Sequence, residues 1–491
     1  MEFIGAQPSV DLTYSDVFLV PRHSELGSRL AVDLAPRDGT PATVPLVASN
    51  MNSVTGPRLA AVLARRGGLA VLPQDLSLEG TERAIRWVKE QPAEVDTPIA
   101  LGEAQTAADA LGLIPRAEGQ SVVVVIGDPA ETPISAERVR GILSSERLAG
   151  VPADARLGDL IQGSPALLDA SLVADPRETF DAVDAALSGS ADGAVGVVDG
   201  GALLGTLSLR SALRRSIYRP ALDGDGRLAV AAAVGINGDV AGKARSLAAA
   251  GADALVVDTA HGHQAGMLRA LRAVAELDLG LPIVAGNIVT ADGVHDLVEE
   301  GASILKVGVG PGAMCTTRMM TAVGRPQFSA VLETAQAARE LGAHVWADGG
   351  VRYPRDVALA LAAGAASVMI GSWFAGTAES PGELLSDAEG RQYKESWGMA
   401  STKAVQGRFG GLEAFERARK ELFAEGISSS KIYLDPQRPS VEDLVDMITS
   451  GVRSSLTYAG AATLQEFHVR AHVGLQSAAG YEEGKALPVS W

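Results

Sequence analysis

The sequence predicts an α/β protein built on a (β/α)8 barrel that an inserted domain interrupts. A unit of helix, glycine and short apolar strand recurs through the second half of the chain, and one copy lies near the N-terminus. The stretch between them lacks the unit. At 491 residues the chain also exceeds the usual size of one compact domain, so two or three domains are expected.

The repeated unit is clearest in three segments, which read AAAGADALVVD (248–258), VEEGASILKVG (298–308) and LAAGAASVMIG (361–371). Each joins the end of an Ala-rich helix to a glycine suited to a left-handed C-cap and then to a buried strand. LGAHVWADGG (341–350) is a variant, and LARRGGLAVLPQ (63–74) is the early copy. This alternation indicates parallel strands with helical crossovers, and five or more units favour a barrel over an open sheet.

The interruption sets the domain boundaries. Residues 94–220 carry short strands and helices without the glycine unit. Because insertion at an exposed loop is well tolerated, we expect barrel residues at 1–93 and 221–491 and an inserted domain at 94–220. Residues 385–440 are rich in charge, glycine and serine, and a long irregular segment of this kind is usually a functional flap or disordered. Its aromatic and Gly-Met content favours a flap within the second barrel segment.

Composition excludes several classes of protein. A formal net charge of −17 argues against nucleic-acid binding, because phosphate backbones need a basic surface. No run of eighteen apolar residues predicts a membrane span, and the N-terminus does not read as a signal peptide. A single cysteine excludes a disulfide framework and fits a reducing compartment. We therefore expect a soluble, cytoplasmic enzyme.

That single cysteine, Cys315, stands in the loop VGPGAMCTTR (309–318), directly after a predicted strand. Barrel enzymes place their active sites on the loops after the strands. A lone cysteine is commonly a small buried apolar residue. Here glycines, two threonines and Arg318 surround it, and backbone amides with a guanidinium favour the reactive thiolate. The context favours a nucleophile.

Two acids also end predicted strands: Asp258, in VVDTAHGH, and Asp348, in WADGG. An acid in this position is often the N-cap of the next helix. Their shared placement at strand ends favours hydrogen bonds to a ligand such as a ribose. His261 and His263 follow Asp258, but no further cluster supports a metal site, so we interpret them as loop histidines.

Glycine and serine follow two more strands, in DGGV (348–351) and MIGSWFAG (369–376). Loops after the last barrel strands often hold phosphate through backbone N–H groups. Each signal is weak by itself. The chain has no GxGxxG between a strand and a helix, which argues against a Rossmann cofactor domain.

These motifs together resemble one family, the IMP dehydrogenase and GMP reductase enzymes. The resemblance covers both barrel segments and includes LTYSDVFLVP (12–21), VASNMNSVT (47–55), AGNIVT (285–290), GVGPGAMCTTR, MIGSWFAGTAESPGE and YKESWGMAS (393–401). In that family the barrel carries an inserted pair of CBS modules, and GVVDGGALLGTLSLRSAL is similar to one CBS half. The usual Asp of that half is Ser211 here, which argues against adenine-nucleotide binding there.

The resemblance also implies roles for residues. Cys315 attacks C2 of the purine nucleotide to form a thioimidate, Thr317 and Glu425 transfer protons, and Asp348 holds the ribose. One phosphate position departs from the family pattern, because a serine is replaced by Ala313. The substrate residues implied are Ser49, Met51, Asp348, Gly349, Gly350, Gly371, Ser372, Gly398 and Met399. The cofactor residues implied are Asp258, Thr259, Asn287 and Gly308.

Reductases and dehydrogenases of this family share the covalent adduct and differ in its fate. A dehydrogenase hydrolyses the adduct with an Arg-Tyr pair on the flap. Residues 385–424 contain no such dipeptide, and Arg408-Phe409 lacks the phenol. ASNMNSV and RSSLTYAGA (453–461) are also reductase-like, whereas DTAHGH and the CBS insert are dehydrogenase-like. We give the missing Arg-Tyr dipeptide more weight than the CBS insert, because an inserted domain can be kept while the chemistry of the site changes. The resemblance then implies NADPH-dependent reductive deamination of GMP to IMP and ammonia.

Two alternatives stay open: oxidation of IMP by NAD to XMP, and a non-catalytic nucleotide sensor acting through the CBS pair. The resemblance further implies a homotetramer or homo-octamer and ATP or GTP regulation through the insert. It also implies a monovalent cation such as K⁺ on the carbonyls of Gly310, Gly312 and Cys315.

Overall fold

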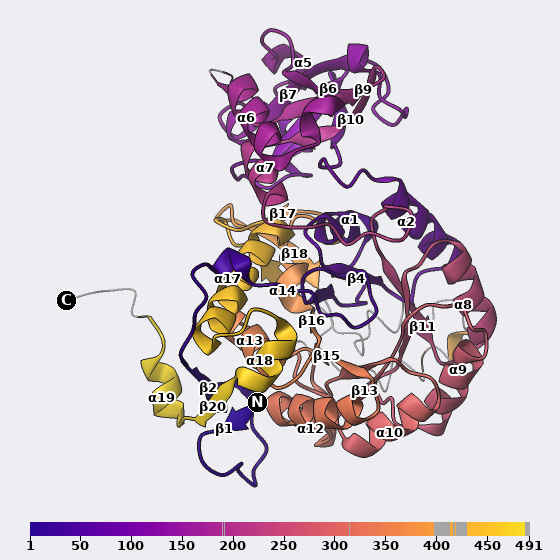
Figure 1. Cartoon of the computed structure of the whole chain (residues 1–491). Coiled ribbons are helices and arrows are strands. Elements are labelled where there is room, and N and C mark those ends of the chain that lie inside the picture. The colour runs from indigo at the N-terminus through magenta and orange to yellow at the C-terminus, as the bar shows by residue number, and fades with distance from the viewer. Residues whose placement is uncertain are drawn as a thin grey trace.

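The computed structural model describes residues 1–188, 190, 192–313, 315–396, 413–415, 418 and 430–486. Its centre is a closed barrel of parallel strands, ringed by helices (Figure 1). The strands, in their order around the barrel, are β11 (Ala231–Gly235), β12 (Ala254–Asp258), β13 (Ile283–Ile288), β14 (Ile304–Val307), β15 (His344–Asp348), β16 (Ser367–Ile370), β3 (Leu46–Ala48) and β4 (Leu69–Leu72). The predicted (β/α)8 barrel is confirmed.

The helices of the repeated unit end where the sequence predicts. α8 (Val240–Ala249) is followed by Gly251 at φ 105°, and α10 (Ala291–Glu299) by Gly301 at φ 103°. L side chains rarely adopt this conformation, so glycine lets the chain turn from helix to strand. The other helices around the barrel are α1 (Pro57–Arg65), α2 (Leu78–Glu90), α9 (Ala265–Ala275), α12 (Gln327–Glu340), α13 (Pro354–Ala362), α17 (Val441–Ala459) and α18 (Leu464–Arg470).

The barrel interior is filled with side chains rather than open. Small residues of β11 and β12 pack against larger ones from the opposite strands, and Trp346 is fully buried among them. The Trp346 indole Nε1 donates to Asp38 Oδ2 at 2.7 Å, so this buried N–H is satisfied. The packed interior supports the carboxyl ends of the strands, where the functional residues were expected.

The chain between α2 and β11 forms two small sheets, which lie outside the barrel (Figure 1). One contains β5 (Ala100–Gly102), β6 (Ser121–Val125) and β7 (Val139–Ser144); the other contains β8 (Leu167–Asp169), β9 (Val195–Asp199) and β10 (Ala202–Leu207). In each sheet the first two strands pair in parallel and the last two antiparallel. The two sheets therefore repeat one plan.

Buried ion pairs join this segment to the barrel. Arg214, on α7 (Leu209–Arg215), contacts Glu442 at 3.1 Å and Asp443 at 2.6 Å, both in the first turn of α17. Arg66 reaches the same Glu442 at 2.6 Å and also Asp96 at 3.3 Å. Ser211, the residue that departs from the CBS pattern, donates its hydroxyl to Asp96. The junction is held by charge-assisted hydrogen bonds.

A third sheet lies where the flap was predicted. β17 (Leu385–Ser386), β18 (Gln392–Ser396) and β19 (Ser430–Tyr433) pair antiparallel, and residues 397–412 and 419–429 between them lie outside the described residues. Ser396 Oγ lies 2.9 Å from Ser53 Oγ, close to the end of β3. Buried Lys394 of β18 donates to the carbonyls of Ala378 and Ser380. Burial lowers the pKa of this lysine to about 8.

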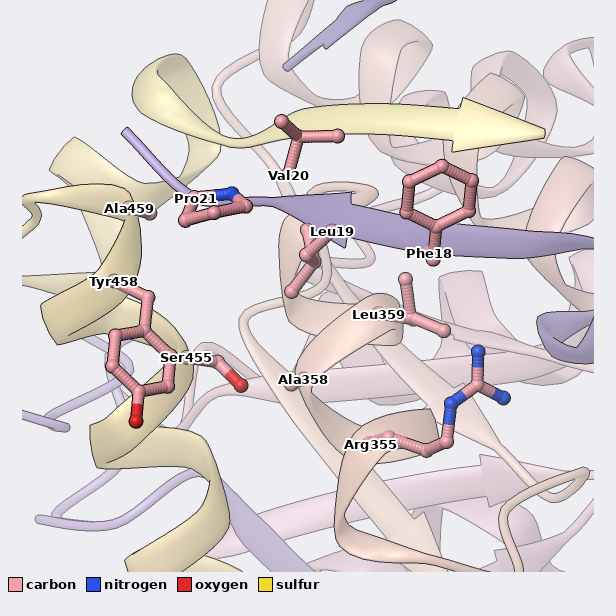
Figure 2. A pocket seen from close by; sticks show the side chains of 10 residues that line it. All are labelled: Phe18, Leu19, Val20, Pro21, Arg355, Ala358, Leu359, Ser455, Tyr458 and Ala459. Atoms are coloured by element: carbon pink, nitrogen blue, oxygen red, sulfur yellow. The ribbon is translucent and has the colours of Figure 1, made fainter. Parts of the chain in front are cut away.

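An apolar groove of about 400 Å³ lies on the outer side of the barrel, between β2 (Val17–Val20) and helices α13 and α17. Figure 2 shows Phe18, Leu359 and Tyr458 among the side chains that line it. It shares no residue with the cavity at the strand ends. None of the helices in the described part of the chain combines the length and apolarity that a bilayer crossing requires.

Candidate active site

A cavity of about 360 Å³ opens at the carboxyl ends of the barrel strands. Its walls come from the loops after most of these strands, which is where the fold places active sites. Every site residue predicted from the sequence that the structure describes lines this one cavity. These residues are Ser49, Met51, Asp258, Thr259, Asn287, Gly308, Gly310, Gly312, Cys315, Thr317, Asp348, Gly349, Gly350, Gly371 and Ser372. The remaining three, Gly398, Met399 and Glu425, lie outside the described residues.

Cys315 lies on the loop between β14 and the short helix α11 (Thr317–Thr321), and its side chain is exposed to the cavity. The thiol donates to Thr317 Oγ1 across 3.3 Å. The alkyl chain of Arg318 packs over Gly310 at the other end of the loop. This arrangement presents a thiol and a hydroxyl together to a bound molecule, as a nucleophile with a proton-transfer partner requires.

The floor of the cavity carries a buried cation between two acids. Lys306 Nζ lies 2.9 Å from Asp258 Oδ1 and 2.8 Å from Asp348 Oδ2, and its side chain is 4% exposed. Burial acts to lower the pKa of Lys306, but the two carboxylates outweigh it and raise the pKa above its ordinary value. Lys306 therefore stays protonated over the whole physiological range.

Two asparagines hold the same carboxylates from the sides. Asn50 Nδ2 donates to Asp258 Oδ2 at 2.8 Å. Asn287 Nδ2 donates to Asp348 Oδ2 at 2.9 Å and to the Gly308 carbonyl at 2.6 Å. Since both acceptors take hydrogen bonds from the amide nitrogen of Asn287, its oxygen must face elsewhere.

Three buried oxygens that line the cavity have no hydrogen-bond partner among the described residues: Ser49 Oγ, Gln74 Oε1 and Asn287 Oδ1. Buried polar atoms are rarely left unpaired in native proteins, because each costs about 1–3 kcal/mol. Such oxygens clustered in one cavity indicate a polar ligand with several N–H and O–H donors. A purine nucleotide and a nicotinamide carboxamide both supply such donors.

Glycines form the opposite wall. Gly350 has φ 82°, and a Cβ there would lie 3.2 Å from Pro311 Cβ, so the loops after β14 and β15 approach closely at this point. Gly371 and Ser372 follow β16, and Ser372 begins the short helix α14 (Ser372–Ala375). Gly371 and Ser372 both line the cavity, and main-chain N–H groups there suit an anion, which is what the sequence predicts for this wall.

The loop histidines do not enter the cavity lining. His263 Nε2 lies 2.6 Å from Asp296 Oδ2 on α10. Among the described residues, no group of three or more His, Cys, Asp or Glu side chains is arranged to hold a metal ion.

Three residues of the site escaped the sequence reasoning: Lys306, Asn50 and Gln74. Lysine is almost never fully buried without a partner, so Lys306 inside the apolar run SILKVGVG was a usable signal. Asn50 and Gln74 lie inside motifs already recognised, but nothing in their spacing shows that they face the cavity.

A sequence model described as the IMP dehydrogenase / GMP reductase domain matches residues 11–486. The chain belongs to the IMP dehydrogenase / GMP reductase family. It is 53% identical, over the full length of both chains, to a GMP reductase of Mycobacterium tuberculosis. It is 33% identical to an inosine-5'-monophosphate dehydrogenase of Halalkalibacterium halodurans, over 93% of this chain and 91% of that protein.

A solved structure of this family is also similar. A GMP reductase from Trypanosoma brucei, in complex with guanosine 5'-monophosphate, superposes with a TM-score of 0.68 at 30% sequence identity. The match covers 98% of this chain and 99% of that one. The family resemblance stated from the sequence is therefore confirmed.

Proposed function

We propose that this chain is a GMP reductase, which converts GMP to IMP and ammonia at the expense of NADPH. The observation that carries the proposal is full-length identity of 53% with GMP reductases, against 33% with an inosine-5'-monophosphate dehydrogenase. The absence of an Arg-Tyr dipeptide in residues 385–424 points the same way, because a reductase needs no base to activate water.

The cavity supports the chemistry. Cys315 adds through sulfur to C2 of the guanine ring, and the 2-amino group leaves as ammonia after it gains a proton. Thr317, whose hydroxyl contacts the thiol, relays that proton, together with Glu425. NADPH, when bound, supplies the hydride that C2 accepts as the C–S bond breaks. The products would be IMP, ammonia and NADP⁺, and Cys315 would be regenerated as the free thiolate.

The polar groups divide between the two ligands. Asp348 accepts hydrogen bonds from the ribose of GMP, and the N–H groups at Gly350, Gly371 and Ser372 hold its phosphate, as the position taken by Ala313 offers no hydroxyl. Asn287 Oδ1 and Thr259 face the nicotinamide amide. The partnerless oxygen of Asn287 supports this assignment, because it needs an N–H donor that no described residue supplies.

The two small sheets support the proposal of a CBS pair, since they repeat one strand plan. We propose that this pair binds ATP or GTP and that the chain assembles as a homotetramer or octamer. Ser211 already bonds Asp96 and Ser208, which argues against a ribose at that half. Calorimetry with each nucleotide and sedimentation of the full chain test these proposals.

A monovalent cation is proposed on the carbonyls of Gly310, Gly312 and Cys315. The Gly312 carbonyl accepts the Cys315 amide at 3.0 Å, which leaves it one lone pair for an ion. Turnover measured in K⁺ against a matched concentration of Na⁺ tests this proposal.

The decisive assay has two arms. The purified chain is incubated with GMP plus NADPH, and separately with IMP plus NAD, and absorbance at the reduced-nicotinamide band is followed. We expect loss of NADPH and release of ammonia in the first arm only. NADH formation with XMP release in the second arm, without NADPH loss in the first, overturns the proposal. Replacing NADPH by NADH in the first arm tests the cofactor choice.

A further inference from the structure

We infer that Lys306 is a positioning residue, which keeps Asp258 and Asp348 both ionised at the cavity floor so that Asp348 can accept the hydroxyls of the nucleotide ribose. The inference rests on the proposed function for the identity of that ligand. It assigns a role to a side chain of β14 that the reaction does not otherwise use.

The hydrogen bonds around Asp348 fix its orientation. Lys306 Nζ and Asn287 Nδ2 both bond Oδ2, at 2.8 and 2.9 Å. The second carboxylate oxygen, Oδ1, is left for a donor in the cavity that Asp348 lines. A carboxylate held on one oxygen and open on the other suits a pair of ribose hydroxyls, which donate and need an ionised acceptor.

Asp258 is arranged differently. Lys306 bonds its Oδ1 at 2.9 Å and Asn50 bonds its Oδ2 at 2.8 Å, so both of its oxygens are engaged by the chain itself. Asp258 thus anchors Lys306 from the side of β12, while Asp348 receives the ligand on the side of β15. Lys306 is placed between these strands because β14 lies between β13 and β15 in the barrel.

Charge explains why a cation is required. One ammonium and two carboxylates give the cluster a net charge of −1. Without Lys306 the same floor carries −2 on two half-buried carboxylates, with no cation between them. Repulsion between two neighbouring carboxylates favours the uptake of one proton by the pair. An Asp348 that holds this proton is a poorer acceptor for the ribose.

The chain offers a matched control at the other end of the barrel. Lys89 of α2 lies 2.8 Å from Asp223 Oδ2 and 2.7 Å from Asp253 Oδ2, and its side chain is 5% exposed. Asp253 directly precedes β12, so this second Asp–Lys–Asp cluster lies at the amino ends of the strands. Both clusters place one buried lysine between two aspartates, although Asp223 also pairs with Arg227 at 3.0 Å.

The first experiment compares the full chain with Lys306→Met and Lys89→Met by calorimetric titration with GMP, without NADPH, from pH 6 to 9. For Lys306→Met we expect GMP to bind at least tenfold more weakly at pH 7, with a proton released on binding and affinity that rises with pH. Lys89→Met and the unmodified chain share the titration of the GMP phosphate, so they report the background pH dependence. Thermal melts confirm that each variant is folded.

The second experiment uses Lys306→Met/Asp258→Asn, in which the cluster returns to a net charge of −1. Because Asp348 is then the only carboxylate of the floor, we expect the extra proton release to disappear and part of the affinity to return. A general packing defect at position 306 would not be repaired by Asp258→Asn. This double variant also keeps the inference testable if Lys306→Met does not fold.

The outcomes separate the two proposals. Unchanged GMP affinity and pH dependence in Lys306→Met overturns the inference, as does a double variant no better than the single one. GMP binding by the unmodified chain without any NADPH consumption overturns the proposed reaction and leaves the inference standing. No GMP binding by the unmodified chain overturns both.

Discussion

The thiol of Cys315 lies 3.3 Å from the hydroxyl oxygen of Thr317, two residues further along the same loop. A strand, a glycine loop and the start of a helix, consecutive in the chain, carry the two groups. The proposed nucleophile and its proposed proton-transfer partner thus belong to one loop, while the groups proposed to bind the substrate come from other strands of the barrel.

Replacing Cys315 by alanine removes the sulfur atom that we propose bonds the purine. Because Asp348 and the glycine wall are untouched, we expect GMP to bind with nearly the same affinity. We expect kcat to fall about 10⁴-fold or more. NADPH consumption under saturating GMP, together with calorimetry, checks this. Residual turnover within tenfold of the unmodified chain would exclude a covalent role for this sulfur.

Thr317→Val keeps the shape of the side chain and removes the hydroxyl. Loss of one proton-transfer group costs about 10²- to 10⁴-fold in rate, so kcat should fall by this amount with little change in KM. The control is Thr321→Val on the same helix, whose exposed hydroxyl bonds main-chain groups of its own turn. If a steady-state assay shows the same fall in kcat for both substitutions, the effect comes from a less stable helix and the proton-transfer role of Thr317 is contradicted.

Gly350→Ala tests the close approach of two loops. The added Cβ would lie 3.2 Å from Pro311 Cβ at a φ of 82°, so the loops must separate or the backbone must shift. We expect KM for GMP to rise about tenfold, which corresponds to about 1.4 kcal/mol. Gly342→Ala is the matched control, because it has φ 71° but no atom within 4 Å of the new Cβ. It should lower the melting temperature without changing KM.

The cluster around Lys89 predicts acid sensitivity. Burial acts to raise the pKa of Asp223, but hydrogen bonds from Lys89 and from main-chain amides outweigh it and lower the pKa to about 2. The folded state therefore gains stability from this ionised group above about pH 4, and that stability is lost as the pH falls towards 2. Asp223→Asn should lower the free energy of unfolding more at about pH 6 than at about pH 3. Asp225→Asn, at an exposed side chain of the same loop, is the control, and at about pH 6 it should lower the free energy of unfolding less than Asp223→Asn does.

The sequence predicts the barrel well because its signal is local. Each helix, glycine and strand lies within about a dozen residues, as in the segment that ends α8 and forms β12. Cys315, Asp258 and Asp348 were found for the same reason, since each directly follows or ends a strand. The floor of the cavity was not found. Lys306 contacts Asp258 and Asp348 only when β12, β14 and β15 are in place in the closed sheet. Hydrophobic periodicity along the sequence does not predict contacts between different strands.

The closure of the barrel has a kinetic consequence. Val71 of β4 pairs with Ala231 of β11, although both small sheets lie between them in the chain. The two paired residues are therefore far apart in the sequence. The long chain segment between them must be brought into a loop before β4 and β11 can pair. During synthesis β3 and β4 leave the ribosome long before their partner strands β16 and β11 are made. The apolar edges of β3 and β4 therefore remain unpaired and exposed until then. The pair of β3 and β16, with Ile370 opposite Ala48, is more distant still in the chain. We expect refolding to end in a slow phase that reports on the joining of these two strand pairs.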